Sequence, residues 1–505
     1  MNAILIYPEF PDTFWSFKHA LRFVRKRASY PPLGLLTVAA MLPVDWTLRL
    51  VDLNVRALTA EDLADADIAF ISAMTVQRES TVGVIAQCHA AGVTIVAGGP
   101  LFAAEPGNFD RVAHLVLNEA EVTLPEFLAD FERGCARHVY TTTEFADIET
   151  TPVPRWDLID MNHYASMCLQ FSRGCPFNCD FCNVTALFGH RPRTKRADQI
   201  IAELDSLHAA GWRRGVFFVD DNLIGNRKRL RNELLPALIA WRRGRKGFPF
   251  STEASINLAD DPALMEMMVE AGFNAVFIGI ETPEADSLAE CSKKQNLNRD
   301  LLADVRRINR CGLQVQGGFI VGFDSDTPQT FQRLIDFIQS SGIVTAMVGL
   351  LQAPPGTRLH TRMAEAGRLR GVMSGDNVDG TTNIVPVMDG EVLRSGYRRM
   401  VRHLYSPQAF YQRARTFLRD YEPPAIAIPW TLPYLRERTM ALVKSTYRLG
   451  VVDRGRRQYW TFFFWALRRK PAVFSMAITF AIYGYHFRRI CQLRMPEPSS
   501  NGHAM

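Results

Sequence analysis

Three cysteines fall within eight residues of a chain that has nine cysteines in 505 residues. They are Cys175, Cys179 and Cys182, in the segment FSRGCPFNCDFCNV. Thiolates bind soft metal ions and iron–sulfur clusters. Clustered cysteines outside an oxidising compartment indicate metal binding or catalysis more than disulfide bonding.

The kind of metal centre depends on whether a fourth ligand lies nearby. A structural zinc site needs one, usually from a second pair of cysteines or histidines, and the sequence contains no such pair. Cys168 lies inside the preceding predicted strand, while Cys291 and Cys311 stand alone. A cubane [4Fe–4S] cluster held by three cysteines leaves one iron without a protein ligand, and that iron can bind a chelating substrate.

The cysteines follow the first of six apolar segments that alternate with helical patterns. This alternation predicts a partial or complete (β/α) barrel over 166–385, with its chemistry at the carboxyl ends of the strands. The predicted strands are 168–174, 216–222, 248–255, 275–281, 315–323 and 345–351.

A separate α/β unit precedes this barrel. Its short apolar runs alternate with helical segments over 1–135, which predicts an open, Rossmann-like parallel sheet. Ligands of such sheets bind beyond the carboxyl ends of the strands, where this chain has SAMT, GGP and NEAE. The predicted strands are 3–7, 47–53, 68–73, 93–99 and 114–119, and the polar segment 136–165 is interpreted as a linker.

The remaining segment, 386–505, predicts a helical domain rich in arginine and aromatic residues, with a polar tail after Pro496. Its stretch 471–487 contains no charged residue but is short for a membrane span. A buried helix and an interfacial helix flanked by arginines both fit it.

The overall composition is that of a folded protein, with 47% hydrophobic and 22% charged residues. The net charge of +6 gives no support for nucleic-acid binding. The first ten residues lack a basic segment ahead of an apolar run, so the sequence predicts a cytoplasmic protein, with membrane association left open.

The motif C-x3-C-x2-C after the first barrel strand, with Phe181 before the last cysteine, resembles that of the radical S-adenosylmethionine (radical SAM) enzymes. The resemblance implies that the open iron of a [4Fe–4S] cluster chelates S-adenosylmethionine. An external donor such as flavodoxin or ferredoxin then supplies the electron that releases a 5′-deoxyadenosyl radical. It also implies a set of S-adenosylmethionine-binding residues: Phe181, Asp220, Asp221, Glu253, Glu281, Gly318 and Gly322.

The first domain is similar to the cobalamin-binding domain found ahead of many radical SAM enzymes. The segments SYPPLGLLTVAAML, IVAGGPLFAAEP and LNEAEVTLPEF carry the similarity. No Asp-x-His motif occurs in 1–150, so the resemblance does not supply a histidine ligand for cobalt. The cobalamin-binding residues that it implies are Ser72, Met74, Thr75, Gly98, Gly99, Pro100 and Glu119.

Within this group the chain resembles the hopanoid C-2 methylase-like proteins, through segments such as DDNLIGNRKR and EAGFNAVFIGIETPE. The resemblance implies methylation of an unactivated carbon in a small-molecule or lipid substrate, and the C-terminal region is compatible with peripheral membrane contact. Two alternatives stay open: a non-methylating cobalamin radical enzyme, such as a cyclase, and a non-catalytic iron–sulfur protein. The substrate, the oligomeric state and the lower ligand of cobalt are not given by the sequence.

Overall fold

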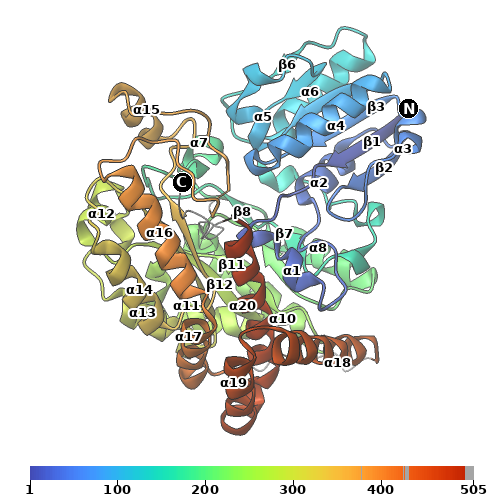
Figure 1. Ribbon diagram of the computed structural model, residues 1–505. Coiled ribbons are helices and arrows are strands. Elements are labelled where there is room, and N and C mark those ends of the chain that lie inside the picture. The colour runs from blue at the N-terminus through green and yellow to red at the C-terminus, as the bar shows by residue number, and fades with distance from the viewer. Residues whose placement is uncertain (377, 425, 427–431, 495–505) are drawn as a thin grey trace, which may run out of the picture.

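The computed structural model describes residues 1–376, 378–424, 426 and 432–494. Two parallel sheets lie side by side, and a group of helices covers the end of the second sheet away from the first (Figure 1). This arrangement confirms the predicted fold class of an open sheet, a barrel-like unit and a helical C-terminal region. The polar tail predicted after Pro496 lies outside the described residues.

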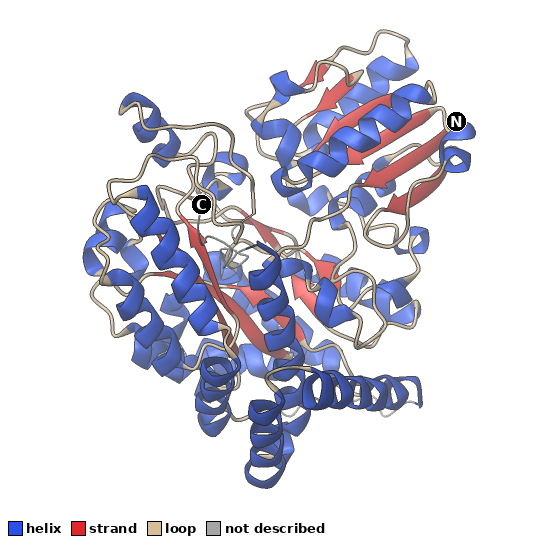
Figure 2. Cartoon of the chain, in the orientation of Figure 1, coloured by secondary structure: helices blue, strands red, loops and turns tan. Residues whose placement is uncertain are grey.

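The first sheet has six parallel strands in the order β2-β1-β3-β4-β5-β6. Its strands are apolar on both faces because helices cover both sides, as in other doubly wound sheets (Figure 2). The strands are β1 (Asn2–Tyr7), β2 (Thr47–Asp52), β3 (Ile68–Ser72), β4 (Thr94–Gly98), β5 (His114–Val116) and β6 (Val139–Tyr140), and the helices are α2 (Leu33–Met41), α3 (Ala60–Ala64), α4 (Arg78–Ala90), α5 (Pro100–Ala104) and α6 (Ala120–Glu132).

The sixth strand corrects one expectation from the sequence. Val139–Tyr140 pairs with β5, in the segment 136–165 that the sequence indicates as a linker. Two residues are too few to show a periodic pattern, so β6 is defined by its neighbour rather than by its own sequence.

The second sheet also has six parallel strands, in the order β14-β13-β12-β11-β10-β7. Each strand pairs with its neighbour in sequence, and β7 and β14 form the two edges, so the barrel is partial. The strands are β7 (Met167–Leu169), β10 (Val216–Phe218), β11 (Phe250–Glu253), β12 (Phe273–Glu281), β13 (Gln314–Val321) and β14 (Ala346–Leu350), and the helices include α8 (Ala197–Ala209), α10 (Leu235–Arg242), α11 (Pro262–Ala271), α12 (Ala285–Glu290), α13 (Leu301–Arg310) and α14 (Thr330–Ser341).

The first predicted strand of this unit is divided into two parts. After β7 the chain bends, and β8 (Ser172–Arg173) pairs antiparallel with β9 (Arg193–Thr194). The cysteine segment therefore forms the loop of a two-stranded ribbon at the carboxyl edge of the sheet. A short helix, α7 (Val184–Phe188), closes the loop.

The C-terminal helices support the second sheet and part of the N-terminal segment. α20 packs on the helical turns Phe14–Ser16 (η1) and Lys18–Leu21 (α1): the rings of Phe14 and Phe487 stack at 4.1 Å. Within the described residues no helix has the length and apolar content needed to cross a membrane. The helices are α15 (Arg358–Glu365), α16 (Gly390–Leu404), α17 (Pro407–Asp420), α18 (Leu432–Tyr447), α19 (Arg456–Arg469) and α20 (Phe474–Arg494).

Candidate functional site

The cysteine loop begins at a glycine that no other residue replaces easily. Gly174 has φ of +93°, and a Cβ at this position would lie 3.0 Å from the carbonyl oxygens of Phe188 and Gly189. Cys175 N donates to the same Gly189 oxygen at 3.3 Å. The tight return of the chain thus sets the direction in which the first thiol leaves the ribbon.

Two side-chain amides approach the thiols, one after strand β10 and one in the helical turn Lys294–Asn296 that follows α12. Asn222 Nδ2 lies 3.9 Å from Cys175 Sγ, and Gln295 Nε2 lies 3.6 Å from Cys179 Sγ. Burial raises the pKa of Cys175 above its ordinary value and that of Cys182 to about 12. Both thiols are therefore poor free nucleophiles, and binding to a metal is what would keep them deprotonated.

The donor set fits an iron–sulfur cluster better than one metal ion. Among the described residues, no three His, Cys, Asp or Glu side chains converge closely enough to hold a single ion. In a cubane cluster each thiolate binds a different iron, so the three sulfurs need not meet at one point. Amide donors beside the sulfurs are the hydrogen bonds that such clusters accept.

Lys293 is a largely buried cation beside the cysteine loop, and it is not among the site residues predicted from the sequence. Its Nζ donates to Glu281 Oε1 at 2.6 Å and lies 5.8 Å from the centre of the Phe181 ring. Glu281, a predicted S-adenosylmethionine ligand, is therefore already paired, and its φ of +64° marks an irregular end of β12. Lys293 follows α12 without a recognisable motif, so only the fold identifies it.

Asp220 holds the bend that precedes the cysteine loop. Its Oδ2 accepts from Phe171 N at 3.1 Å, and its Oδ1 accepts from the backbone N–H of Ser172 and from Ser172 Oγ, the latter at 2.6 Å. Asp220 is fully buried. The structure thus gives this residue a role in positioning the loop, and contact with a cofactor remains a prediction for it.

Two other predicted residues carry carboxylates with unused oxygens. Asp221 Oδ2 is buried and accepts no hydrogen bond from a described residue, and burial raises the pKa of Asp221 to about 6. Burial, with the nearby Asp221 and Asp220, raises the pKa of Glu253 to about 8. A buried carboxyl group without a hydrogen-bond partner is unfavourable. These two groups are therefore suited to bind hydroxyl or ammonium groups of a ligand.

The two predicted glycines of the fifth barrel strand serve packing and a turn. A Cβ on Gly318 would lie 2.8 Å from the Phe277 ring, so the glycine makes room for that aromatic side chain. Gly322 has φ of +106°, and its N–H donates to Asp326 Oδ2 at 2.7 Å. Cofactor binding by either glycine remains a prediction.

A cavity of about 620 Å³ crosses the inner face of the second sheet. Every strand of that sheet contributes to its wall, and the N-terminal segment that includes Trp15 and Tyr30 covers it. Trp15 meets Phe277 edge to face at 5.4 Å and its Nε1 donates to Met347 Sδ at 2.9 Å. The wall is mainly aromatic and aliphatic, and it includes two carboxyl groups, those of Glu253 and of the buried Asp376.

A second cavity, of about 320 Å³, lies at the carboxyl edge of the first sheet. Three of the predicted cobalamin-binding residues, Ser72, Met74 and Pro100, line it. The other residues of these strand ends do not: a Cβ on Gly98 would lie 2.6 Å from Val116 O, and a Cβ on Gly99 would lie 2.7 Å from Ser72 Oγ. Both glycines therefore permit close packing at the cavity rim. The lining residues that the two cavities share are Tyr7, Leu33, Gly34, Met74 and Val219.

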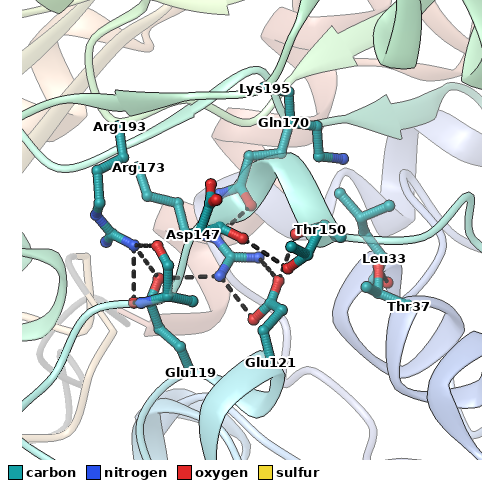
Figure 3. Close-up of polar contacts among 12 residues, drawn as sticks. Leu33, Thr37, Glu119, Glu121, Asp147, Thr150, Gln170, Arg173, Arg193 and Lys195 are labelled. Atoms are coloured by element: carbon teal, nitrogen blue, oxygen red, sulfur yellow. Dashed lines mark hydrogen bonds and ion pairs between the residues drawn. The ribbon is translucent and has the colours of Figure 1, made fainter.

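Glu119 points away from this second cavity, toward two arginines of the cysteine ribbon (Figure 3). Arg193 Nη1 lies 2.9 Å from Glu119 Oε2, and Arg173 Nη1 lies 2.9 Å from Glu119 Oε1. Arg173 also pairs with Glu121 at 2.8 Å. We call these four side chains the interdomain clamp. Its carboxylates have side chains 2% and 6% exposed, so Glu119 is occupied by an ion pair rather than open to a cofactor.

The remaining predicted cobalamin-binding residue, Thr75, lines neither of the two cavities. It lies next to Gly375, where an added Cβ would be 3.0 Å from Thr75 Cβ. Thr75 therefore packs against the segment that follows the second sheet, and its binding role remains a prediction.

Comparison with known proteins adds the following. A model described as the Radical SAM superfamily matches 169–338, and one described as a domain of unknown function (DUF4070) matches 357–497. An uncharacterised methyltransferase of Synechocystis sp. is 40% identical over 96% of this chain and 91% of its own length. The hopanoid C-2 methylase of Rhodopseudomonas palustris is 36% identical over 82% of this chain and 78% of its own length.

The fold is also similar to that of a solved structure. The radical S-adenosylmethionine methyltransferase TsrM from Kitasatospora setae, solved with cobalamin and a [4Fe–4S] cluster bound, superposes with a TM-score of 0.61. The match covers 88% of this chain and 99% of TsrM at 13% identity.

Proposed function

Since the chain belongs to the radical S-adenosylmethionine methyltransferases, we propose that it methylates an unactivated carbon of a bulky, mainly apolar substrate, with cobalamin as the methyl carrier. A lipid of the isoprenoid class is the substrate that we favour. The hopanoid C-2 methylase of R. palustris, whose name gives a polycyclic lipid as its substrate, supports this choice through its 36% identity.

The observation that carries the proposal is the contact between the two cavities. The cavity at the first sheet and the cavity at the second sheet share lining residues, among them Leu33, Met74 and Val219. A methyl carrier at one sheet edge and a substrate on the other sheet must meet over a short distance for a group to pass between them. Adjoining cavities, one at the carboxyl edge of the first sheet and one on the inner face of the second, supply that arrangement.

The chain's own residues would divide the work as follows. Cys175, Cys179 and Cys182 would hold the iron–sulfur cluster, and the first cavity would hold cobalamin. When bound, these groups supply a radical that removes a hydrogen atom from the substrate and a methyl group that replaces it. A carbon radical reacts with whatever lies nearest, so the covering segment around Phe14 and Trp15 would exclude water from the reaction.

The cavity wall also indicates how a substrate would be oriented. Trp15, Phe277 and Met347 form one continuous apolar contact surface, which suits a rigid ring system. Glu253 lines the same cavity and forms no ion pair with a residue that the structure describes, so it would then hydrogen-bond to a polar group of the substrate or of S-adenosylmethionine. An external one-electron donor, such as flavodoxin or ferredoxin, would reduce the iron–sulfur cluster.

Anaerobic reconstitution with iron, sulfide and cobalamin tests this function. The loaded enzyme is incubated with a strong reductant, S-adenosylmethionine carrying a deuterated methyl group, and lipid extracts containing polycyclic isoprenoids. We expect a deuterated methyl group in one lipid, with S-adenosylhomocysteine and 5′-deoxyadenosine formed in comparable amounts.

Two variants complete the experiment. Cys179→Ala should lose both the cluster and the cleavage of S-adenosylmethionine, while Cys311→Ala, an isolated cysteine outside the loop, should retain both. If the deuterated methyl group is found only in water-soluble, polar molecules, that result would contradict the proposed substrate class. Production of 5′-deoxyadenosine without S-adenosylhomocysteine would contradict methyl transfer.

A further inference from the structure

The three C-terminal helices α18–α20 carry a charge that differs sharply from the rest of the chain. Residues 432–494 contain thirteen arginines and lysines and two acidic residues, a net charge of +11. Because the whole chain has a net charge of +6, everything else sums to −5. A local excess of positive charge of this size, in an otherwise mildly acidic protein, indicates a surface that binds an anionic partner.

Most of this excess is not neutralised by the protein itself. The two acidic residues are occupied: Glu437 pairs with Arg214 and Asp453 pairs with Arg488. Several exposed arginines of this region form no ion pair with a residue that the structure describes. They include Arg436, Arg448, Arg454, Arg456, Arg457, Arg468 and Arg469.

The same region also carries exposed apolar side chains. Val443 and Tyr447 are 58% and 65% exposed, one helical turn apart on α18. The π-helical turn that follows, Arg448–Val452, leaves Val451 and Val452 54% and 46% exposed, and it contacts both α18 and α19. Nine of the twenty exposed large apolar side chains in the described residues fall in 432–494, about an eighth of that part.

The position of these helices suits contact with an extended surface. α18 and α19 project from the end of the molecule opposite the first sheet (Figure 1). α20, which packs against both, also supports the cover of the large cavity: His486 Nε2 bonds to Phe14 O at 3.0 Å. A surface that binds α18 and α19 therefore lies close to the element that closes the cavity.

We propose that α18, the turn Arg448–Val452 and α19 form a docking surface for an anionic lipid bilayer, with Val443, Tyr447, Val451 and Val452 entering the headgroup region. Apolar side chains bordered by arginines and by an aromatic residue are what an interfacial site requires, and anionic headgroups complement the charge of +11. Nucleic acid would explain the arginines but not the aliphatic valines, because phosphate contacts need no apolar insertion. Vesicle binding tests this surface independently of the enzyme's activity. Only the use of the surface, which is delivery of a lipid substrate to the cavity, rests on the proposed function.

Vesicle flotation of the full-length protein tests this proposal. Vesicles of phosphatidylcholine alone are compared with vesicles containing phosphatidylglycerol, at two salt concentrations. We expect flotation with the anionic vesicles only, weakened at high salt. Each arginine near an anionic surface contributes about fivefold to binding, so Arg456→Glu with Arg457→Glu should weaken it by at least about tenfold.

A matched pair of variants separates this surface from general charge. Arg398 and Arg399 are adjacent, exposed and without an ion pair to a described residue, on α16, and reversing both changes the net charge equally. We expect that control to keep most of the flotation. Tyr447→Ser with Val451→Ser removes only apolar surface, and it should also weaken binding several-fold with no change in charge.

Several outcomes would overturn the proposal. They are no flotation with anionic vesicles, equal losses in the two arginine pairs, or full binding by the serine variant. Binding of RNA in a gel-shift assay, without flotation, would assign the arginines to nucleic acid instead.

Discussion

Arg173 lies two residues before Cys175 and donates hydrogen bonds from one guanidinium to both Glu119 and Glu121 of the first domain. The cysteine ribbon and the carboxyl edge of the first sheet are thus joined by a buried ion pair. The contact between the two cavities depends on the relative position of the two sheets. The interdomain clamp therefore contributes to how closely the two cavities adjoin.

Arg173→Ala should destabilise the protein and loosen the contact between its two sheets. It leaves Glu119 and Glu121 buried with Arg193 as the remaining arginine, and such a loss typically costs about 3–5 kcal/mol. Chemical unfolding and limited proteolysis between the domains measure the effect. Arg196→Ala breaks a surface pair with Asp198 and should cost under about 1 kcal/mol, so equal effects in the two variants would contradict the clamp.

The stabilisation by this clamp should depend on pH in a defined direction. Burial alone would raise the pKa of Glu121, but the Arg173 guanidinium outweighs it and lowers that pKa to about 2. A carboxyl whose pKa is lowered on folding stabilises the folded state above its unfolded pKa of about 4.3 and loses that contribution as the pH falls toward 2. The difference in unfolding free energy between wild type and Arg173→Ala should therefore shrink from pH 5 to pH 3, and a constant difference would contradict the assignment.

Asp220→Asn should reduce the amount of cluster that the protein holds. The amide nitrogen of asparagine cannot accept the hydrogen bonds that Phe171 N and Ser172 donate to the carboxylate, so the bend before the loop loses an acceptor. Iron and sulfide per chain, with the visible absorbance of the cluster, measure the effect after reconstitution. Asp198→Asn, on the surface, serves as the control, and full iron content in Asp220→Asn would refute this role.

Gly99→Ala should impair binding at the cavity of the first sheet. Its added Cβ would lie 2.7 Å from Ser72 Oγ, in a residue with φ of +89°. Gly92→Ala is a matched control, because Gly92 has φ of +71° and nothing within 4 Å of the added Cβ. Both variants place a Cβ at a positive φ, which costs about 1–3 kcal/mol, and cobalamin titration by absorbance should show a weaker affinity for Gly99→Ala only. Equal affinities would place cobalamin away from this rim.

Trp15→Ala should weaken substrate binding more than it slows the chemical step. Trp15 contacts Phe277 and Met347 at the cavity, so its removal widens the site and loses apolar contact. We expect a higher KM, about tenfold or more, and more 5′-deoxyadenosine formed without methylated product. Trp46→Phe, in the first sheet's core, is the control. An unchanged KM in Trp15→Ala would mean that the substrate lies elsewhere.

Much of the architecture follows from local sequence. The strands of both sheets are continuous apolar runs, because each is covered on both sides, and all but Val139–Tyr140 could be located from periodicity. The family resemblance also follows from local sequence, since the spacing of Cys175, Cys179 and Cys182 is confined to one loop. The membership in a methyltransferase family agrees with that prediction and not with a non-catalytic or non-methylating protein.

The tertiary structure decided which groups are free and which are occupied. The resemblance implies a cofactor role for Glu119, yet its carboxylate pairs with Arg173 and Arg193, which lie 54 and 74 residues away. Lys293 pairs with Glu281, and Trp15 closes a cavity that belongs to strands more than 150 residues later.

The sequence by itself thus determined the elements and the metal-binding loop, because their signals depend on neighbours along the chain. Only the tertiary structure decided the partners of each charged side chain and the walls of the cavities. Those features depend on residues that meet through folding, and an ion pair or a cavity leaves no periodic pattern in either of the segments that form it.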